Sequence, residues 1–332
     1  MNQMVDTMEQ KNTIINLYNS GIDPEIISLE LDLDKDIVIQ VIEIETNRKV
    51  SEQRNNLSDS LNSLYLEAVI DINSIIKESQ VRTWQALKVK PDFNISIKDT
   101  QNILEKYLES KVNLVILHID LVGSTRMSLS LPIERLTTII RSFAQQMSLI
   151  VSMYGGYVLK YIGDAVLAFF VAEDKYNIEN IKEEKDTLNK ENDNLDALCY
   201  TNAINCACTM IKVIQEGINP ILNQYDYPEL KVRVGMDVGE IAVVQYGMDV
   251  EEYKGTEFRK PHIDLIGYTI SIAVKMTSLS QPNNIVIGQK LFDKIDEKHK
   301  DSFHQLTNNP DIWNYVNDAT GGVYKIYGTF PD

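Results

Sequence analysis

An aspartate stands at the end of one apolar segment and another stands just before a second, and this pairing constrains the fold more than any other feature. Asp120 ends the apolar run 114–119, and Asp164 lies in a turn-like segment directly before the apolar run 165–170. A carboxylate beside a buried strand is costly unless something pairs with it. Two such carboxylates could share a pair of divalent cations, and hard oxygen ligands completed by substrate phosphates suit Mg²⁺ or Mn²⁺. The pattern indicates phosphoryl or nucleotidyl transfer, although either aspartate alone is also typical of a helix cap or a turn.

The residues around the two aspartates predict the order of strands and helices. After Asp120, a glycine turn leads to Ser124 and Thr125, which can cap a helix whose first N–H groups would face the metals and a triphosphate. A Gly-Gly turn at 155–156 precedes a strand and then a hairpin tip that carries Asp164. Strand, helix and hairpin, with one carboxylate on each strand end, predict an α+β fold: a ferredoxin-like βαββαβ sheet preceded by a helical N-terminal region.

Four segments, in order, resemble the signature blocks of class III nucleotidyl cyclases. They are residues 119–125 (IDLVGST), 155–164 (GGYVLKYIGD), 232–240 (VRVGMDVGE) and 264–276 (DLIGYTISIAVKM). The resemblance covers roughly residues 111 to 330, about two thirds of the chain. Four ordered blocks are specific, whereas any one of them alone would be weak.

The resemblance implies a homodimer that binds an NTP in sites built across the interface. One subunit would hold two divalent cations, Mg²⁺ or Mn²⁺, through Asp120, Asp164 and the backbone carbonyl of Ile119. One metal would help to deprotonate the ribose 3′-hydroxyl, which attacks the α-phosphorus, and the other would neutralise the departing pyrophosphate.

The resemblance assigns roles to five further residues, of which Lys160, Asp264 and Arg259 would come from the opposite subunit. Lys160 and Asp264 would read the base, and Arg259 would grip the triphosphate through bidentate contacts. Where family members carry Asn and Arg on one helix face, this chain has Ser271 and Lys275, which would orient the ribose and stabilise the developing charge. Lysine keeps the charge without the planar fork, and serine donates a hydrogen bond with less reach than asparagine.

Two readings compete with an active cyclase. A module could keep the fold, sense a nucleotide or dimerise, and have no turnover. A nucleotidyl transferase or GGDEF-like polymerase could use a related palm sheet, but the chain has YIGDA at 161–165 in place of that group's hairpin and carries the fourth block that the group lacks.

The chemistry of these residues does not decide which base the substrate NTP carries. Lys160 offers donors and a charged Asp264 offers acceptors, a combination that suits an edge of any of the four bases. Lysine with aspartate resembles an adenylate cyclase. In its altered residues Ser271 and Lys275, and in lacking a recognisable sensor or membrane module, the chain resembles the bacterial antiphage pyrimidine cyclases of the Pycsar system. We therefore predict a pyrimidine cyclase whose product, cyclic UMP or cyclic CMP, is read by a separate effector; the alternative is an adenylate cyclase. Three tyrosines near the site are typical of core packing and could also narrow the pocket: Tyr157, Tyr161 and Tyr268.

Composition and charge favour a soluble cytoplasmic protein. No run approaches the about 18 apolar residues of a membrane span, and the polar start at 1–11 does not resemble a signal peptide. A formal net charge of −16 disfavours nonspecific binding to nucleic acid or anionic membranes. Three cysteines, Cys199, Cys206 and Cys208, fall in one predicted helix, so we expect reduced thiols and neither a disulfide framework nor a metal cluster.

The 332-residue chain divides into three predicted regions. Residues 1–56 read as three short helices and a polar connector, and their acidic character disfavours DNA recognition. Residues 57–110 contain one long helix, 57–87, which could pair with its twin and support the dimer. Residues 111–332 form the cyclase domain. Within it, the charged, Asn-rich segment 172–196 reads as a solvated loop or a protruding helix before a helix that begins near residue 198.

Overall fold

The computed structural model describes residues 8–19, 24, 27–28, 31–42, 70–88, 98–172, 188–253, 256–306, 311–317 and 321–330. The chain divides into two compact units, Met1–Leu64 and Tyr65–Asp332. In the first unit, helix α1 spans Met8–Asn19, and residues 35–42 are also helical. The three apolar segments predicted there meet in one small core, formed by Ile14, Ile27, Val38 and Ile42.

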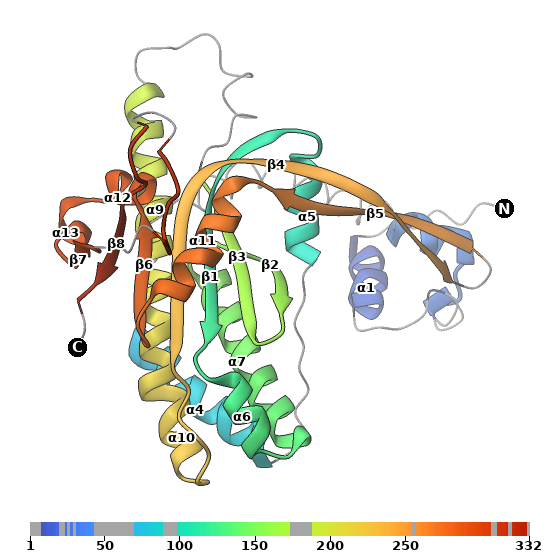
Figure 1. Ribbon diagram of the computed structural model, residues 1–332. Helices are drawn as coiled ribbons and strands as arrows, with labels where there is room; N and C mark the ends of the chain where they lie inside the picture. The colour runs from blue at the N-terminus through green and yellow to red at the C-terminus, as the bar shows by residue number, and fades with distance from the viewer. Residues whose placement is uncertain are drawn as a thin grey trace. The chain divides into compact units, whose positions relative to one another are not determined.

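A sheet is the framework of the second unit (Figure 1). Its strands are β1 (Lys111–Leu121), β2 (Tyr157–Ile162), β3 (Ala165–Val171), β4 (Val232–Tyr253), β5 (Thr256–Ile266), β6 (Asn284–Gly288), β7 (Phe303–Gln305) and β8 (Ile326–Thr329). Within the described residues the strand order is β2-β3-β1-β4-β6-β8-β7, and β5 pairs with β4. The segment β4-β1-β3-β2 is antiparallel throughout, which is the order of a ferredoxin-like sheet. The predicted α+β class and sheet are confirmed.

Helices cover both faces of this sheet (Figure 1). They are α4 (Ile72–Lys88), α5 (Lys98–Lys106), α6 (Ser124–Ser130), α7 (Ile133–Met153), α9 (Leu188–Lys212), the π-helix η1 (Val213–Ile218), α10 (Asn219–Asn223), α11 (Tyr268–Leu279), α12 (Gln289–Lys294) and α13 (Glu297–Lys300). Alternate residues of β1 point to opposite faces. Val115 and Leu117 pack with α7 and α9, whereas Leu114 and Ile116 pack with α5 and β5 on the face that also holds α11.

The second half of β4 continues past the start of β1 and pairs with β5 (Figure 1). On β5, Ile263 and Leu265 share a buried cluster with Leu159 of β2 and Leu167 of β3. The returning strand β5 therefore lies over the β2–β3 part of the α11 face. This crossing brings Asp264 of β5 to Lys160 of β2, although neither strand is paired with the other.

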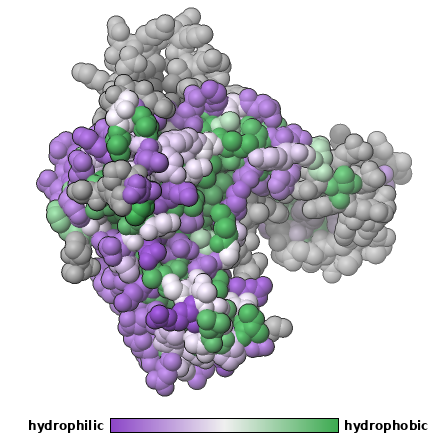
Figure 2. Space-filling view, viewed as in Figure 1, coloured by the Kyte–Doolittle hydropathy of each residue, from purple (hydrophilic) through white to green (hydrophobic). Residues whose placement is uncertain are grey.

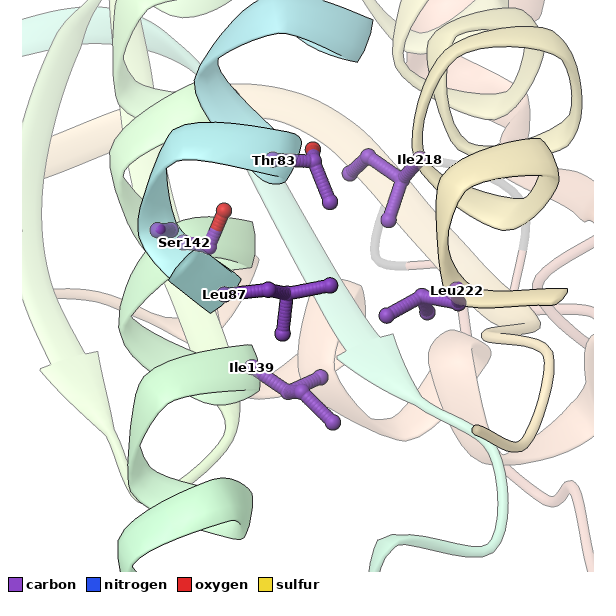
Figure 3. Close-up of a pocket in the computed structure, with 7 residues that line it drawn as sticks. Thr83, Leu87, Ile139, Ser142, Ile218 and Leu222 are labelled. Atoms are coloured by element: carbon purple, nitrogen blue, oxygen red, sulfur yellow. The ribbon is translucent and has the colours of Figure 1, made fainter. Parts of the chain in front are cut away.

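Helix α4 packs against α7 and η1 through a face of small side chains. Ser79, Thr83 and Ala86 are buried there, and the amide of Gln146 on α7 donates to the Thr83 hydroxyl (2.9 Å). A small apolar cavity remains between these three elements and α10, which contributes Leu222; Figure 3 shows Leu87 pointing into it from α4. Of the predicted helix 57–87, residues 70–87 are described and are helical from Ile72, whereas 57–69 and the connector 47–56 lie outside the described residues.

Two local predictions need correction. Ser124 and Thr125 lie inside α6; its N-cap is Gly123, at φ 75°, and no side chain caps it. Glycine provides this left-handed turn at little cost, and it takes the position that a capping side chain would need. Helix α9 begins at Leu188, ten residues before the predicted start near residue 198. The end of the predicted insertion is therefore helical, in agreement with the helix alternative and not with the loop; residues 173–187 lie outside the described part.

The three cysteines lie in one helix, α9, as predicted; Cys199 and Cys206 are buried and Cys208 is exposed. None of the described helices combines the length and apolar character needed to cross a membrane.

Candidate active site

Asp120 and Asp164 meet at one edge of the sheet. Asp120 is the penultimate residue of β1 and is half-buried on the α11 face, and Asp164 lies in the β2–β3 turn beside Gly163, at φ 63°. Burial raises the pKa of Asp120 above its ordinary value, and the neighbouring charge of Asp164 raises it further. The two carboxylates that the sequence singled out are therefore close enough to repel each other.

The Asp164 carboxylate has an unsatisfied oxygen. Its Oδ2 atom is buried and has no hydrogen-bond partner among the described residues. A buried carboxylate oxygen without a partner is expensive in free energy. A divalent cation between Asp120 and Asp164 would satisfy this oxygen and relieve the repulsion, so the residues present fit the metals that the resemblance implies.

The ligand set at this edge is small. Within the described residues, no cluster of three or more His, Cys, Asp or Glu side chains is placed to hold a metal. At this edge the described residues therefore offer two carboxylates, and backbone oxygens and substrate phosphates would have to complete the shell. This is the usual arrangement for Mg²⁺, which binds one or two carboxylates together with phosphates and waters.

The Ile119 carbonyl, predicted as a backbone ligand, is engaged within the sheet. Ala172 N–H donates to the Asn113 carbonyl (2.9 Å), which sets the phase of the β1–β3 ladder. Hydrogen-bonded pairs alternate along an antiparallel ladder. Six residues further along β1, Ile119 is therefore bonded to Val166 of β3, its partner in the register.

The carbonyl of Leu121 is differently placed. It points from the same edge of β1 as the Ile119 carbonyl, but the last β1–β3 pair is at Ile119. The Leu121 carbonyl therefore lies beyond the ladder, on the side of the turn that carries Asp164. The Leu121 N–H also hydrogen-bonds to the Asp120 carboxylate and lowers its pKa.

Arg233 joins this edge, and the sequence reasoning missed it. It is the second residue of β4, directly opposite Asp120 in the β1–β4 register, and its charge lowers the pKa of Asp120. Its Nε is buried and has no hydrogen-bond partner in the described part of the chain. In the sequence Arg233 belongs to the third block. An arginine at the start of a strand is usually exposed to solvent, so its position is informative only once its cross-strand neighbour is known.

Ser271 and Lys275 lie four residues apart on α11, on one helix face as predicted. Both are exposed, and neither side chain has a hydrogen-bond or ion-pair partner among the described residues. The opposite face of α11 is buried on β1 and β4. There Gly235 permits close packing, since a Cβ at that position would lie 2.1 Å from the Ala273 carbonyl oxygen.

Lys160 and Asp264 form an ion pair between β2 and β5. Lys160 faces the same side of the sheet as its partner Leu167, and the Asp264 carboxylate also accepts the Leu265 N–H (2.8 Å). The structure thus brings the predicted base-reading pair together within one chain. Arg259 lies on β5 opposite Val250, and its side chain is outside the described residues.

The chain matches the family model for the adenylate and guanylate cyclase catalytic domain over residues 106–309. A cytidylate cyclase of Escherichia coli is 28% identical over 185 residues, which are 54% of this chain and 35% of the relative. A cytidylate cyclase of Staphylococcus aureus is 25% identical over 244 residues, 72% of this chain and 48% of the relative. The matches thus span about half or less of the length of these curated relatives.

Two solved structures are similar to this chain at low identity. The adenylyl cyclase CyaB from P. aeruginosa is 18% identical, with a TM-score of 0.43 over 67% of this chain and 96% of that one. The dimeric guanylyl cyclase domain of the RhoGC fusion protein from Blastocladiella emersonii is 16% identical, with a TM-score of 0.43 over 67% and 98%. Because the family model matches more than half of its residues, the chain belongs to the adenylate and guanylate cyclase catalytic domain family, the class III nucleotidyl cyclases.

Proposed function

We propose that this protein is a nucleotidyl cyclase that converts an NTP to a 3′,5′-cyclic nucleotide and pyrophosphate. The observation that carries the proposal is the edge formed by Asp120 and Asp164, where one carboxylate raises the pKa of the other and one buried oxygen has no partner. A protein retains such a costly pair when a bound cation compensates it. The order of the four sequence blocks supports the same assignment.

Asp120 and Asp164 would hold two divalent cations, Mg²⁺ or Mn²⁺. We propose the Leu121 carbonyl as the backbone ligand in place of Ile119, because the ladder engages Ile119 and leaves Leu121 beyond the last pair. When bound, the metals would supply Lewis acidity for the attacking 3′-hydroxyl and charge neutralisation for the pyrophosphate.

Arg233 would bind the triphosphate beside the metal edge. Its guanidinium has a buried, unpaired Nε and lies across the ladder from Asp120. A planar fork of N–H donors suits phosphate oxygens, and the positive charge offsets the charge that the triphosphate brings to two carboxylates. Arg259 remains a proposed second contact, supplied by the partner subunit.

The second half of the site would come from the partner subunit in a homodimer. Ser271 and Lys275 are exposed and unpaired within the chain, so a bound nucleotide could meet both without breaking an existing interaction. Ser271 would orient the ribose, and Lys275 would stabilise the developing negative charge. Lys160 and Asp264 would exchange part of their mutual ion pair for hydrogen bonds to the base edge. Residues 57–110 are proposed to support this dimer.

We propose a pyrimidine base, cytidine first and uridine second. Relatives named cytidylate cyclase at 25% and 28% identity support this choice. The product would act as a second messenger in antiphage defence, made in the cytoplasm and read by a separate effector. Cyclic AMP as the product and a cyclase-fold module without turnover are the alternatives.

Competition between substrates tests the base. The purified chain is incubated with Mn²⁺ and an equimolar mixture of ATP, GTP, CTP and UTP, and the cyclic products are quantified by mass spectrometry. The proposal expects cyclic CMP or cyclic UMP to dominate. Cyclic AMP as the main product would make Lys160 and Asp264 an adenine-reading pair and contradict the pyrimidine assignment.

A further inference from the structure

Tyr268 stands on the same exposed stripe of α11 as Ser271 and Lys275. Residues three and seven positions apart lie on one side of a helix, and all three side chains are exposed; that of Tyr268 is 48% accessible. Figure 2 views this side of the molecule and shows hydrophobic residues gathered in the middle of the face, beside α11 and β5. A large ring is thus presented to solvent beside two residues proposed to bind the nucleotide.

The Tyr268 ring is held in place although it is not buried. Its centroid lies 6.0 Å from that of Tyr315, with the rings at 72°, and Tyr315 makes a similar edge contact with the buried Trp313 (4.9 Å, 66°). The Trp313 indole N–H donates to the Tyr324 carbonyl (2.7 Å). These supporting residues follow the family match, which ends at residue 309. A C-terminal segment that lies beyond the family match therefore positions the Tyr268 ring.

The other two tyrosines near the site are used differently. Tyr157 is half-buried and stacks on Phe169 in the core (5.5 Å between centroids). The Tyr161 hydroxyl is hydrogen-bonded to Ser148 (2.7 Å). Of these three tyrosines, Tyr268 is the most exposed (48%, against 36% for Tyr161) and lies on the stripe that carries Ser271 and Lys275, so it is the best placed to stack on a ligand.

We infer that the Tyr268 ring stacks on the base of the bound NTP and supplies base affinity that the Lys160–Asp264 pair does not. This inference rests on the proposed function. Asp264 precedes Tyr268 by four residues, and Ser271 and Lys275 follow it. Along the chain, the proposed contacts thus run from the edge of the base, through its face at the Tyr268 ring, to the ribose and then the phosphates. A single-ring base has little surface to bury, and stacking on an aromatic side chain adds affinity for any base.

Two substitutions separate the contribution of the Tyr268 ring from that of its hydroxyl. Tyr268→Leu removes the ring and Tyr268→Phe removes only the hydroxyl; KM and kcat are measured on the full chain for each NTP that the wild type turns over. Stacking predicts that KM rises about tenfold in Tyr268→Leu, with a smaller change in kcat, and that Tyr268→Phe resembles the wild type. Tyr315→Leu, which removes the edge support, should give a smaller rise. Phe330→Leu is the matched control, because Phe330 is another exposed ring (57%) that stacks on His304.

A KM within twofold of the wild type in Tyr268→Leu would overturn the inference, as would an equal loss in Tyr268→Phe. Binding of a 3′-deoxy-NTP, which lacks the attacking hydroxyl, is measured by calorimetry in the same variants, with circular dichroism to verify folding. This readout separates two failures. A wild-type chain without turnover contradicts the proposed cyclase, whereas equal 3′-deoxy-NTP affinities of wild type and Tyr268→Leu contradict the stacking contact alone.

Discussion

The imidazole Nδ1 of His118 on β1 lies 2.9 Å from the hydroxyl of Thr277 on α11, in the buried layer between strand and helix. Burial lowers the pKa of His118 to about 4 although the charge of Asp164 raises it, so the ring is neutral at pH 7. This contact joins β1, the strand that carries Asp120, to α11, the helix that carries Ser271 and Lys275. The position of α11 relative to β1 is therefore held by a contact in the buried core.

Removing the Thr277 hydroxyl should loosen this junction. Thr277→Val leaves the His118 nitrogen buried without a partner, which should lower the free energy of unfolding by about 1–3 kcal/mol. Urea unfolding measures that loss, and kcat should fall as α11 shifts. Thr277→Ser keeps the hydroxyl and should retain most of both quantities. Equal behaviour of the valine and serine variants would show that the hydrogen bond has no part in placing α11.

Metal binding should stabilise the protein through the two carboxylates. Asp120→Asn removes one of two repelling charges, so in EDTA its Tm should equal or exceed that of the wild type. Adding Mn²⁺ should raise the Tm of the wild type by a few degrees and leave that of Asp120→Asn unchanged. Differential scanning calorimetry measures both shifts. An equal Mn²⁺ effect in wild type and variant would place the metal elsewhere.

Asp237 should make stability fall as the pH rises. Burial raises its pKa from 3.8 to about 7, although it accepts hydrogen bonds from the Tyr324 hydroxyl (2.8 Å) and the Val238 N–H (2.9 Å). Between these two values the folded chain binds more protons than the unfolded chain, so the free energy of unfolding decreases with increasing pH across this window.

Urea unfolding from pH 5 to pH 8 tests this dependence. Asp237→Asn should flatten the slope, whereas the exposed Asp293→Asn should leave it as in the wild type. Identical slopes in all three proteins would mean that Asp237 titrates in the same range in the folded and unfolded states.

Restoring the guanidinium fork on α11 should accelerate the reaction. Lys275→Arg is expected to raise kcat several-fold, because an arginine makes bidentate contacts with phosphate oxygens that a lysine cannot. Lys275→Ala should lower kcat about 100-fold. Both are compared by steady-state kinetics at saturating NTP. A kcat for Lys275→Ala equal to that of the wild type would remove Lys275 from the site.

Mixing two inactive variants should restore activity if the sites are shared between subunits. A heterodimer of Asp120→Asn and Lys275→Ala keeps one site in which both groups are intact. Random exchange of subunits should therefore give about a quarter of the wild-type activity. Each variant alone is the control. A mixture no more active than its components, with heterodimers verified by native mass spectrometry, would mean that each subunit builds its own site.

Much of the sheet could be predicted because the spacing of apolar residues and the residues that form turns are local features of the sequence. The order of β1, α7, β2 and β3 follows from apolar runs separated by glycine turns, and the two aspartates stand where those runs break. The crossing of β5 over the β2–β3 face could not be predicted, since it depends on where a long hairpin bends. The resemblance predicted that Lys160 and Asp264 both read the base, whereas their ion pair is a finding of the structure and follows from the crossing.

Backbone and cross-strand effects account for the remaining differences. The choice between the Ile119 and Leu121 carbonyls as the proposed backbone ligand depends on the hydrogen-bond phase of the β1–β3 ladder, which the side-chain pattern of one strand does not indicate. The proposed role of Arg233 could not be predicted, because it depends on Asp120, its partner in the β1–β4 register. Gly123, with its positive φ, took the N-cap position predicted for Ser124 or Thr125.

The most direct test of the central claim is turnover in the Asp120–Asp164 site. The purified protein is incubated with each NTP separately in Mn²⁺, beside Asp120→Asn and Asp164→Asn, and cyclic nucleotide and pyrophosphate are measured together. We predict equal amounts of the two products from the wild type, and none from either variant although both remain folded. Product from the variants at the wild-type rate, or no product from the wild type with any NTP, would contradict the assignment of this protein as a two-metal nucleotidyl cyclase.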